Sequence, residues 1–283
     1  MTDLFYPDYI QHQNLVKEHE DLGKIYAQPM AIWLGRDRYH KLKRVPSRIQ
    51  RLLKRAKNKT VVFVIYSIPN RDISGRHSMG GEEDEESYLK FINEVIEGIG
   101  NHSPIIIYEP DALCDGVKLT KKKSHQRIKL MQTSLKLLTK TNAKIYIDSG
   151  HPNWLKVSEV CSLLKRFKKI PYEGFILNCC NFVDTDSCVE YGTEISKYIG
   201  KNFVIDTSRN GLGYTGNIYN PTNIAIGEYP TLDTKIKNCD GFLWMKPLGE
   251  SDGKVNGTPK AGRFSLKYAL KIIENSKKIN VFK

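Results

Sequence analysis

The sequence lacks several patterns that would assign it to a class at once. No run of residues approaches the ~18 apolar residues of a membrane-spanning helix. The N-terminus has no basic stretch followed by an apolar one, so the chain as given is predicted to be soluble and unprocessed. The six cysteines show no paired C-x-x-C spacing, which predicts reduced, mostly buried thiols rather than a zinc site or a disulfide framework.

Signatures of several common enzyme classes are also missing. We predict no serine nucleophile elbow, no Walker phosphate loop and no zincin site. No G-x-G-x-x-G follows the first predicted strand, which weakens a dinucleotide-binding fold. Asp148 and His151 have the spacing of a metal pair, but no third ligand stands out beside them. We therefore predict neither a metal nor a cofactor.

The sequence does contain a large excess of positive charge. The 44 lysines and arginines outnumber 31 acids, and the formal net charge is +13. Such an excess attracts polyanions such as nucleic acid, phospholipid surfaces or acidic wall polymers, and charge alone does not choose among them. The basic segments Lys41–Lys59 and Lys121–Arg127 fall largely on predicted outer helices, where a solvated face explains them. No membrane partner is predicted, and nucleic-acid binding rests on charge alone.

Seven apolar runs of strand length alternate with helical patterns along the chain. This alternation predicts a parallel α/β architecture, and the length suits one domain over residues 1–283. The predicted strands are Met30–Leu34, Val61–Tyr66, Ile105–Tyr108, Lys144–Ile147, Gly174–Leu177, Phe203–Ile205 and Gly241–Met245. The predicted helices are Ser47–Lys57, Glu85–Ile99, Lys123–Thr139, Val157–Phe167, Val189–Ile199 and Phe264–Asn275.

Polar residues at the ends of these strands favour a closed barrel over an open sheet. They follow six different strands, and only a closed ring brings six strand ends to one rim. Two loops rich in Gly, Asn or Pro, Asn210–Glu228 and Leu248–Arg263, are expected to overhang the same rim. The polar residues are Asp72, Asp111, Asp148, His151, Asn178, Arg209, Lys246 and Asp252.

The stretch Ile105–Leu113 places an acid at the centre of this rim. Three isoleucines predict a strand buried on both faces, and Pro110 ends the strand beside Asp111. Glycoside hydrolysis requires one carboxylic acid to protonate the leaving oxygen and a second carboxylate to activate water or to attack carbon, and sugars stack on aromatic rings. Carboxylates flanked by aromatic residues are what this rim offers.

Six stretches, taken in order, resemble the signature blocks of glycoside hydrolase family 6. Together they span residues 66–253. The resemblance implies a distorted seven-stranded parallel (β/α) barrel, TIM-like in form, which hydrolyses β-1,4-glucan with inversion at the anomeric carbon. The blocks are Tyr66–Asp72 (YSIPNRD), Ile107–Leu113 (IYEPDAL), Tyr146–Leu155 (YIDSGHPNWL), Gly174–Asn181 (GFILNCCN), Asp206–Gly211 (DTSRNG) and Gly241–Gly253 (GFLWMKPLGESDG).

The resemblance also implies catalytic roles. Asp111 matches the family's proton donor, and an N-cap for the following helix is the lesser alternative. Asp72 would raise the pKa of Asp111 by placing a like charge nearby. Asp252 is the expected base acting through water, and a water chain past Ser78 and Asp72 is equally consistent.

Further positions match sugar-binding roles in the family. Tyr66 would press on the sugar ring at the point of cleavage, and Trp154 would stack on a sugar unless it is a core residue. Lys246 and Glu250 would hydrogen-bond sugar hydroxyls. The remaining expected substrate-binding residues are Ser78, Asp148, His151, Asn178, Arg209 and Trp244; a structural histidine is an equal alternative for His151.

Departures from the family pattern bear on the substrate. Pro221-Thr222-Asn223 replaces an expected tryptophan platform, and Ser251 replaces a disulfide cysteine. Short loops predict an open cleft and internal cleavage. We expect a monomer whose partner is a polysaccharide of the cellulose or cell-wall type. A weak or inactive carbohydrate-binding barrel is the alternative. The cellular location is left open: lysis, carriage in a virus particle and truncation of a secreted chain would each bring the protein to such a polymer.

Overall fold

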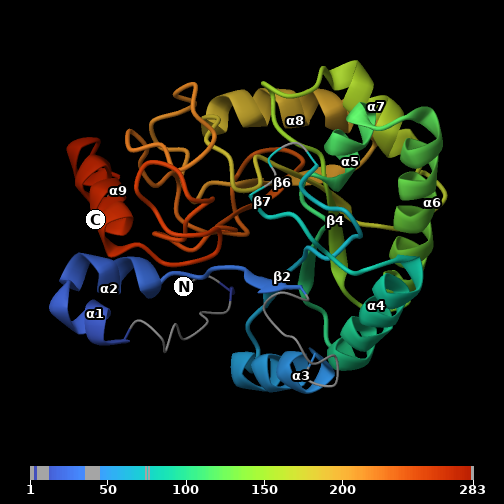
Figure 1. The fold of residues 1–283 in the computed structure, drawn as a ribbon, viewed down its shortest axis with the longest axis horizontal. Coiled ribbons are helices and arrows are strands. Elements are labelled where there is room, and N and C mark those ends of the chain that lie inside the picture. Colours follow the sequence, from blue (N-terminus) through green and yellow to red (C-terminus); the bar gives the residue numbers. More distant parts are fainter. Residues whose placement is uncertain (1–2, 5–12, 36–44, 74, 76, 282–283) are drawn as a thin grey trace.

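The computed structural model describes residues 3–4, 13–35, 45–73, 75 and 77–281, and seven parallel strands within them form one curled sheet (Figure 1). Each strand pairs with the next strand in chain order. This arrangement confirms the predicted distorted seven-stranded (β/α) barrel. The strands are β1 (Ile32–Leu34), β2 (Val62–Ile65), β3 (Ile105–Tyr108), β4 (Lys144–Asp148), β5 (Gly174–Leu177), β6 (Asn202–Asp206) and β7 (Cys239–Leu243).

Helices cover the outside of the sheet, and every predicted helix is present (Figure 1). The longest ones are α3 (Val45–Ala56), α4 (Glu85–Ile99), α6 (Lys121–Leu138), α7 (Val157–Lys165), α8 (Thr185–Ile199) and α9 (Leu266–Lys278). The sequence patterns did not predict α1 (Gln13–Glu18), α2 (Glu20–Tyr26) and α5 (Ala112–Asp115), nor the 3₁₀ turn Gly116–Lys118.

Local capping decides where some of these helices begin. Helix α8 starts four residues before its predicted beginning because the Asp184 carboxylate accepts a hydrogen bond from Ser187 N at 2.8 Å. This bond satisfies a backbone donor that the helix leaves unpaired, a gain of about 1 kcal/mol. The basic segment Lys41–Lys59 contributes α3, and its residues 41–44 lie outside the described part of the chain.

The barrel closes through few contacts between its first and last strands. Ala31 N donates to Trp244 O at 2.9 Å, and Trp33 Nε1 donates to Met245 O at 2.7 Å. Between β6 and β7 the described chain contains no helix. Helices α2 and α9 instead cover this side, where they enclose an apolar cluster that includes Ile226 and Trp244. The seam between β1 and β7 therefore distorts the barrel.

The apolar core lies on both sides of the sheet. Val64, Ile107, Ile176 and Val204 fill the barrel interior, while a larger cluster packs the sheet against α3 to α8. Each fully buried side chain of this size contributes about 1.5–3 kcal/mol. The six cysteines are free thiols and five are buried, which confirms that prediction. Over the residues that the structure describes, no helix is both long and apolar enough to span a bilayer.

Candidate active site

The turn after β3 presents Asp111 at the rim. Glu109 and Asp111 both have positive φ, 49° and 67°, which costs about 1–3 kcal/mol at each position. The buried Glu109 carboxylate holds the turn by accepting hydrogen bonds from Ser67 N and Ile68 N at 3.1 Å and from Tyr88 Oη at 2.9 Å. Asp111 is the N-terminal flanking residue of α5, yet its side chain makes no capping hydrogen bond. The N-cap alternative therefore fails.

The surroundings of Asp111 favour its protonated form. Burial, followed by the negative charges of Asp148, Asp115 and Asp72, raises the pKa of Asp111 well above its usual range. Asp148 Oδ2 accepts a hydrogen bond from Asp111 N at 2.8 Å, and burial raises the pKa of Asp148 to about 7. Asp72 does act on Asp111, but Asp148 and Asp115 act more strongly. The sequence did not indicate this ranking.

Asp72 lies on the loop after β2. It has a φ of 54°, and its carboxylate accepts hydrogen bonds from Gly75 N at 3.0 Å and Ser78 N at 2.5 Å. Arg71 donates to Ser78 O at 2.9 Å and lies over the Tyr66 ring at 4.5 Å. These contacts hold Tyr66, Asp72 and Ser78 together.

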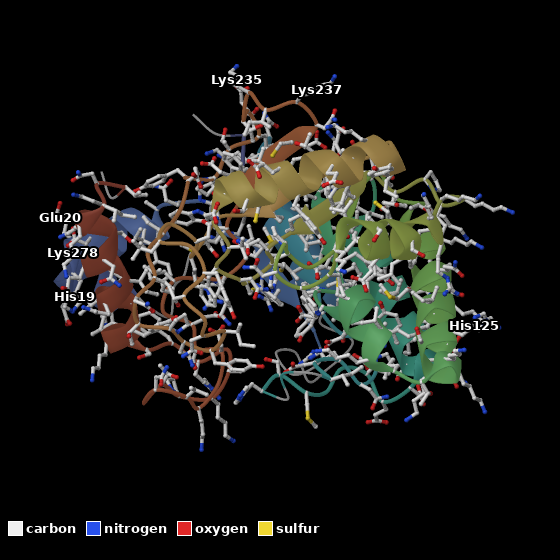
Figure 2. All side chains as sticks on the ribbon, turned by 90° about the horizontal axis from the view of Figure 1, so that it is seen from above. His19, Glu20, His125, Lys235, Lys237 and Lys278 are labelled. Atoms are coloured by element: carbon white, nitrogen blue, oxygen red, sulfur yellow. The ribbon has the colours of Figure 1, made fainter. Side chains whose placement is uncertain are left out.

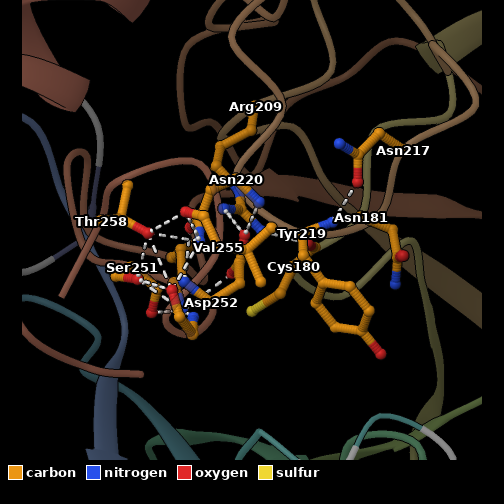
Figure 3. Close-up of polar contacts among 12 residues, drawn as sticks. Cys180, Asn181, Arg209, Asn217, Tyr219, Asn220, Ser251, Asp252, Val255 and Thr258 are labelled. Carbon is orange, nitrogen blue, oxygen red and sulfur yellow. Dashed lines mark hydrogen bonds and ion pairs between the residues drawn. The ribbon is translucent and has the colours of Figure 1, made fainter. Parts of the chain in front are cut away.

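Asp252 sits in a clamp of cations (Figure 3). Its carboxylate contacts Arg209 Nη1 at 2.8 Å and Lys246 Nζ at 3.1 Å, and it accepts a bond from Asn220 N at 3.1 Å. Burial alone would raise the pKa of Asp252, but the two cations outweigh it and hold the pKa at about 2. Asp252 is therefore ionised at neutral pH and is a weak proton acceptor.

Loop contacts link the two sides of the site. The rings of His77 and Tyr219 lie 4.5 Å apart, centroid to centroid. A Cβ at Gly75 would come within 2.4 Å of Asp72 Oδ1 and 2.7 Å of Tyr219 Oη, so both atoms lie against the Gly75 backbone. The loop after β2 thus touches Tyr219 of the loop that follows β6.

Two groups of aromatic residues belong to this end of the barrel. Tyr66 meets Trp33 edge to face with ring centroids 5.4 Å apart. Trp154 is partly exposed, which rules out a fully buried core role, and it lies 5.7 Å from the ring of His151. Burial lowers the pKa of His151 to about 4, so this histidine is neutral near pH 7.

Several predicted substrate-binding residues are buried behind the site. Asp148, Asn178, Arg209 and Trp244 are at most 2% exposed, so in this structure they position other groups rather than reach a substrate. Asn178, for example, donates to Val183 O and Asp206 O. Strand ends carry backbone groups that need partners, and these side chains supply them. Glu250 is also buried, at 6%.

The structure does not place Trp244 at the rim, where a substrate-binding residue was expected. Its indole belongs to the outer apolar cluster under α2 and α9, and Nε1 donates to Glu228 O at 2.9 Å. Trp33, which no sequence motif indicated, lies instead against the barrel interior and Tyr66. Successive side chains of a strand point to opposite faces, and a tryptophan in a buried strand gives no indication of which face it occupies.

Two further patterns are structural. Contrary to the expectation that this signature is missing, Gly249–Gly253 reads G-x-S-x-G, but Ser251 is buried and its hydroxyl lies within hydrogen-bond distance of Gly253 O and Pro259 O, at 2.8 and 2.7 Å, so it is no nucleophile elbow. Cys179, Cys180 and Asp206 form the one metal-like cluster among the described residues. The Asp206 oxygens already accept bonds from three backbone donors after β5, β6 and β7, which identifies a clamp between strand ends. These donors are Cys180 N, Ser208 N and Met245 N.

A distorted barrel carries at one rim an acid of raised pKa, an ionised acid and aromatic residues, which are the groups that glycoside hydrolysis requires. The family model described as "Glycosyl hydrolases family 6" matches residues 8–276. The chain therefore belongs to glycosyl hydrolase family 6.

Individual relatives agree with this assignment. The chain is 38% identical over 267 residues to "Endoglucanase A" of Cellulomonas fimi, covering 90% of this chain and 56% of the relative. It is 34% identical over 208 residues to "Endoglucanase A" of Thermobispora bispora, covering 71% and 45%. The chain thus spans about half the length of these two relatives.

Solved structures support the fold. The endoglucanase Cel6 from Mycobacterium tuberculosis, solved with methyl-cellobiosyl-4-deoxy-4-thio-β-D-cellobioside, matches with a TM-score of 0.90 and 30% identity over 97% of both chains. The endoglucanase CEL6B from Humicola insolens matches with a TM-score of 0.80 at 20% identity and shows the fold alone.

Proposed function

We propose that this protein hydrolyses β-1,4-glucan with inversion at the anomeric carbon and cuts the chain internally. The observation that carries this proposal is the pairing of two acids in opposite states. Asp111 is partly exposed with a raised pKa, while Asp252 is held at a pKa of about 2 by two cations. One group can give a proton at the pH at which the other stays charged.

Asp111 acts as the general acid. It transfers its proton to the glycosidic oxygen as the bond between that oxygen and the anomeric carbon breaks. The raised pKa keeps this proton in place before the reaction, and the turn held by Glu109 fixes the position of the carboxyl group. In its protonated form Asp111 is a donor for the leaving group.

A water molecule attacks the opposite face of the sugar and must lose a proton. The cations around Asp252 weaken it as a base, because proton transfer is less favourable to a group of low pKa. This favours the route in which the proton leaves along a chain of water molecules past Ser78 and Asp72. Asp252 then holds Arg209 and Lys246 in place through its ion pairs.

The substrate assignment comes from the aromatic residues and the relatives. Tyr66 is partly exposed beside Asp111 and Asp72, and Trp154 is partly exposed beside His151, so both rings are available to stack on sugars. Two relatives that cover most of this chain are named endoglucanases, which favours an active enzyme over a binding barrel. Internal cleavage predicts a fast fall in viscosity of hydroxyethyl cellulose for few reducing ends formed.

Substitution of Asp111 tests the proposal. We expect Asp111→Asn to lower kcat on cellohexaose by at least about 100-fold while glucan binding is kept, because a general acid acts in the transition state. NMR of the first product by the wild-type protein should show the α-anomer. Full turnover by the variant, or a β-anomer as first product, would refute the mechanism.

A further inference from the structure

One of the two strongly basic segments of this protein begins after the turn that follows β3. Residues 117–169 contain 14 lysines and arginines and two acids, so this segment has a net charge of +12. Thirteen of these cations are exposed, while Asp148, one of the two acids, is buried. We call these exposed cations the basic face: Lys118, Lys121, Lys122, Lys123, Lys129, Lys136, Lys140, Lys144, Lys156, Lys165, Arg166, Lys168 and Lys169.

The two helices that contribute to the basic face, α6 and α7, touch each other. Helix α6 carries five of the exposed cations. A hydrogen bond from Gln132 Nε2 to Arg166 O at 2.7 Å joins α6 to the end of α7. Figure 2 shows His125 of α6 pointing away from the body of the protein. The exposed side chains of α6 therefore face solvent alongside those of α7.

The start of α6 goes against the local rule for helix stability. Helices α4 and α8 carry acids in their first turn, as the helix dipole favours, whereas α6 begins with Lys121, Lys122 and Lys123 and has no acid there. Across the described residues, no carboxylate forms an ion pair with these three lysines. Positive charges at a helix N-terminus do not stabilise the helix, so we look for the role of these lysines in binding rather than in folding.

The basic face begins beside the candidate active site. Lys118 Nζ lies 5.9 Å from the centroid of the Trp154 ring, in addition to its ion pair with Asp115 at 3.8 Å. Lys156 follows Trp154 by two residues and starts the connection to α7. A glucan chain stacked on Trp154 would therefore continue onto the lysines.

We propose that the basic face binds a β-glucan that carries carboxylate groups, as a continuation of the chain that occupies the rim. This inference rests on the proposed function and names the class of its substrate. Twelve of the 14 cations are lysines, which act as point charges and need no fixed anion geometry, whereas phosphate recognition favours arginine. Val117 is the one exposed large hydrophobic residue of the segment, so the basic face offers no apolar face for lipid.

Binding to carboxymethyl cellulose tests the proposal. All proteins carry Asp111→Asn so that the polymer is not cut. Lys121→Gln, Lys122→Gln and Lys123→Gln are introduced together, and the matched control changes Lys54, Lys237 and Lys267, which are exposed elsewhere, to Gln. We expect the first triple variant to lose about tenfold in affinity at low salt and the control less than about twofold.

Four companion measurements define the result. Neither triple variant should change binding to uncharged hydroxyethyl cellulose, and the α6 variant should melt at least as high as the parent because its lysines oppose the helix dipole. Equal losses in both variants, or tighter retention of duplex DNA or anionic vesicles than of carboxymethyl cellulose, would overturn the proposal. Failure of the wild-type protein to cut hydroxyethyl cellulose would instead refute the proposed function and leave the binding comparison intact.

Discussion

Asp111 N donates a hydrogen bond to Asp148 Oδ2 at 2.8 Å, so the residue that ends β4 holds the turn that follows β3. Asp148 is 1% exposed, and the bond forms between neighbouring strands of the barrel. The same carboxylate also raises the pKa of Asp111 through its charge. One side chain thus sets both the position and the acidity of the proposed proton donor.

Replacing Asp148 by Asn should shift the pH dependence of hydrolysis. The amide oxygen can still accept the bond from Asp111 N, but the negative charge is gone, so the pKa of Asp111 falls. Because Asp111 must be protonated, the alkaline limb of kcat should move down by about one pH unit. A pH profile on cellohexaose measures this shift, and an unmoved alkaline limb would contradict it.

Replacing Lys246 by Met should lower stability above pH 4 and flatten its dependence on acid. The pKa of Asp252 is lowered from 3.8 to about 2, so Asp252 contributes stability that is present above pH 3.8 and is lost as the pH falls through 2. Without Lys246 this pKa lies closer to 3.8, so less of that stability is present above pH 3.8 and less of it is lost in acid. Urea unfolding should show a loss of about 1–3 kcal/mol at pH 5 that narrows towards pH 2. Lys254→Met, an exposed change in the same loop, is the control and should leave the curve in place.

Replacing Gly75 by Ala should disturb Asp72 without harming the core. The added Cβ would meet Asp72 Oδ1 at 2.4 Å and Tyr219 Oη at 2.7 Å, so both must move. We expect kcat to fall at least about tenfold, since misplaced polar groups slow the reaction strongly. Gly116→Ala is the matched control, because its new Cβ has its nearest neighbour at 3.9 Å. Equal activity of the two variants would argue against a role for Asp72.

The two tryptophans of the signature blocks should respond differently to substitution. Trp244→Phe removes the bond to Glu228 O from a buried cluster and should lower the free energy of unfolding by about 1–3 kcal/mol with KM unchanged. Trp154→Ala should raise KM on cellohexaose by about three- to tenfold, the value of a stacking contact. Thermal melting and steady-state kinetics separate the two effects, and a raised KM for Trp244→Phe would restore it to the substrate site.

The pattern of apolar runs in the sequence was sufficient to predict the barrel architecture. Apolar runs at Ile105–Tyr108 and Gly174–Leu177 became β3 and β5 with no change of bounds, because a buried parallel strand needs an uninterrupted apolar segment. The motif around Asp111 likewise placed an acid after an interior strand. Short helices such as α2 were missed, since their stability comes from packing against α9 rather than from their own periodicity.

Tertiary structure decided which of the predicted polar residues face the rim. Asp72, Asp111 and Trp154 are partly exposed there, whereas Asn178 and Trp244 are buried. The order of influence on the pKa of Asp111 and the low pKa of Asp252 also appeared only in three dimensions, because charges interact through space. The sequence by itself determined which groups are available to this protein, and the folded barrel determined which of them meet.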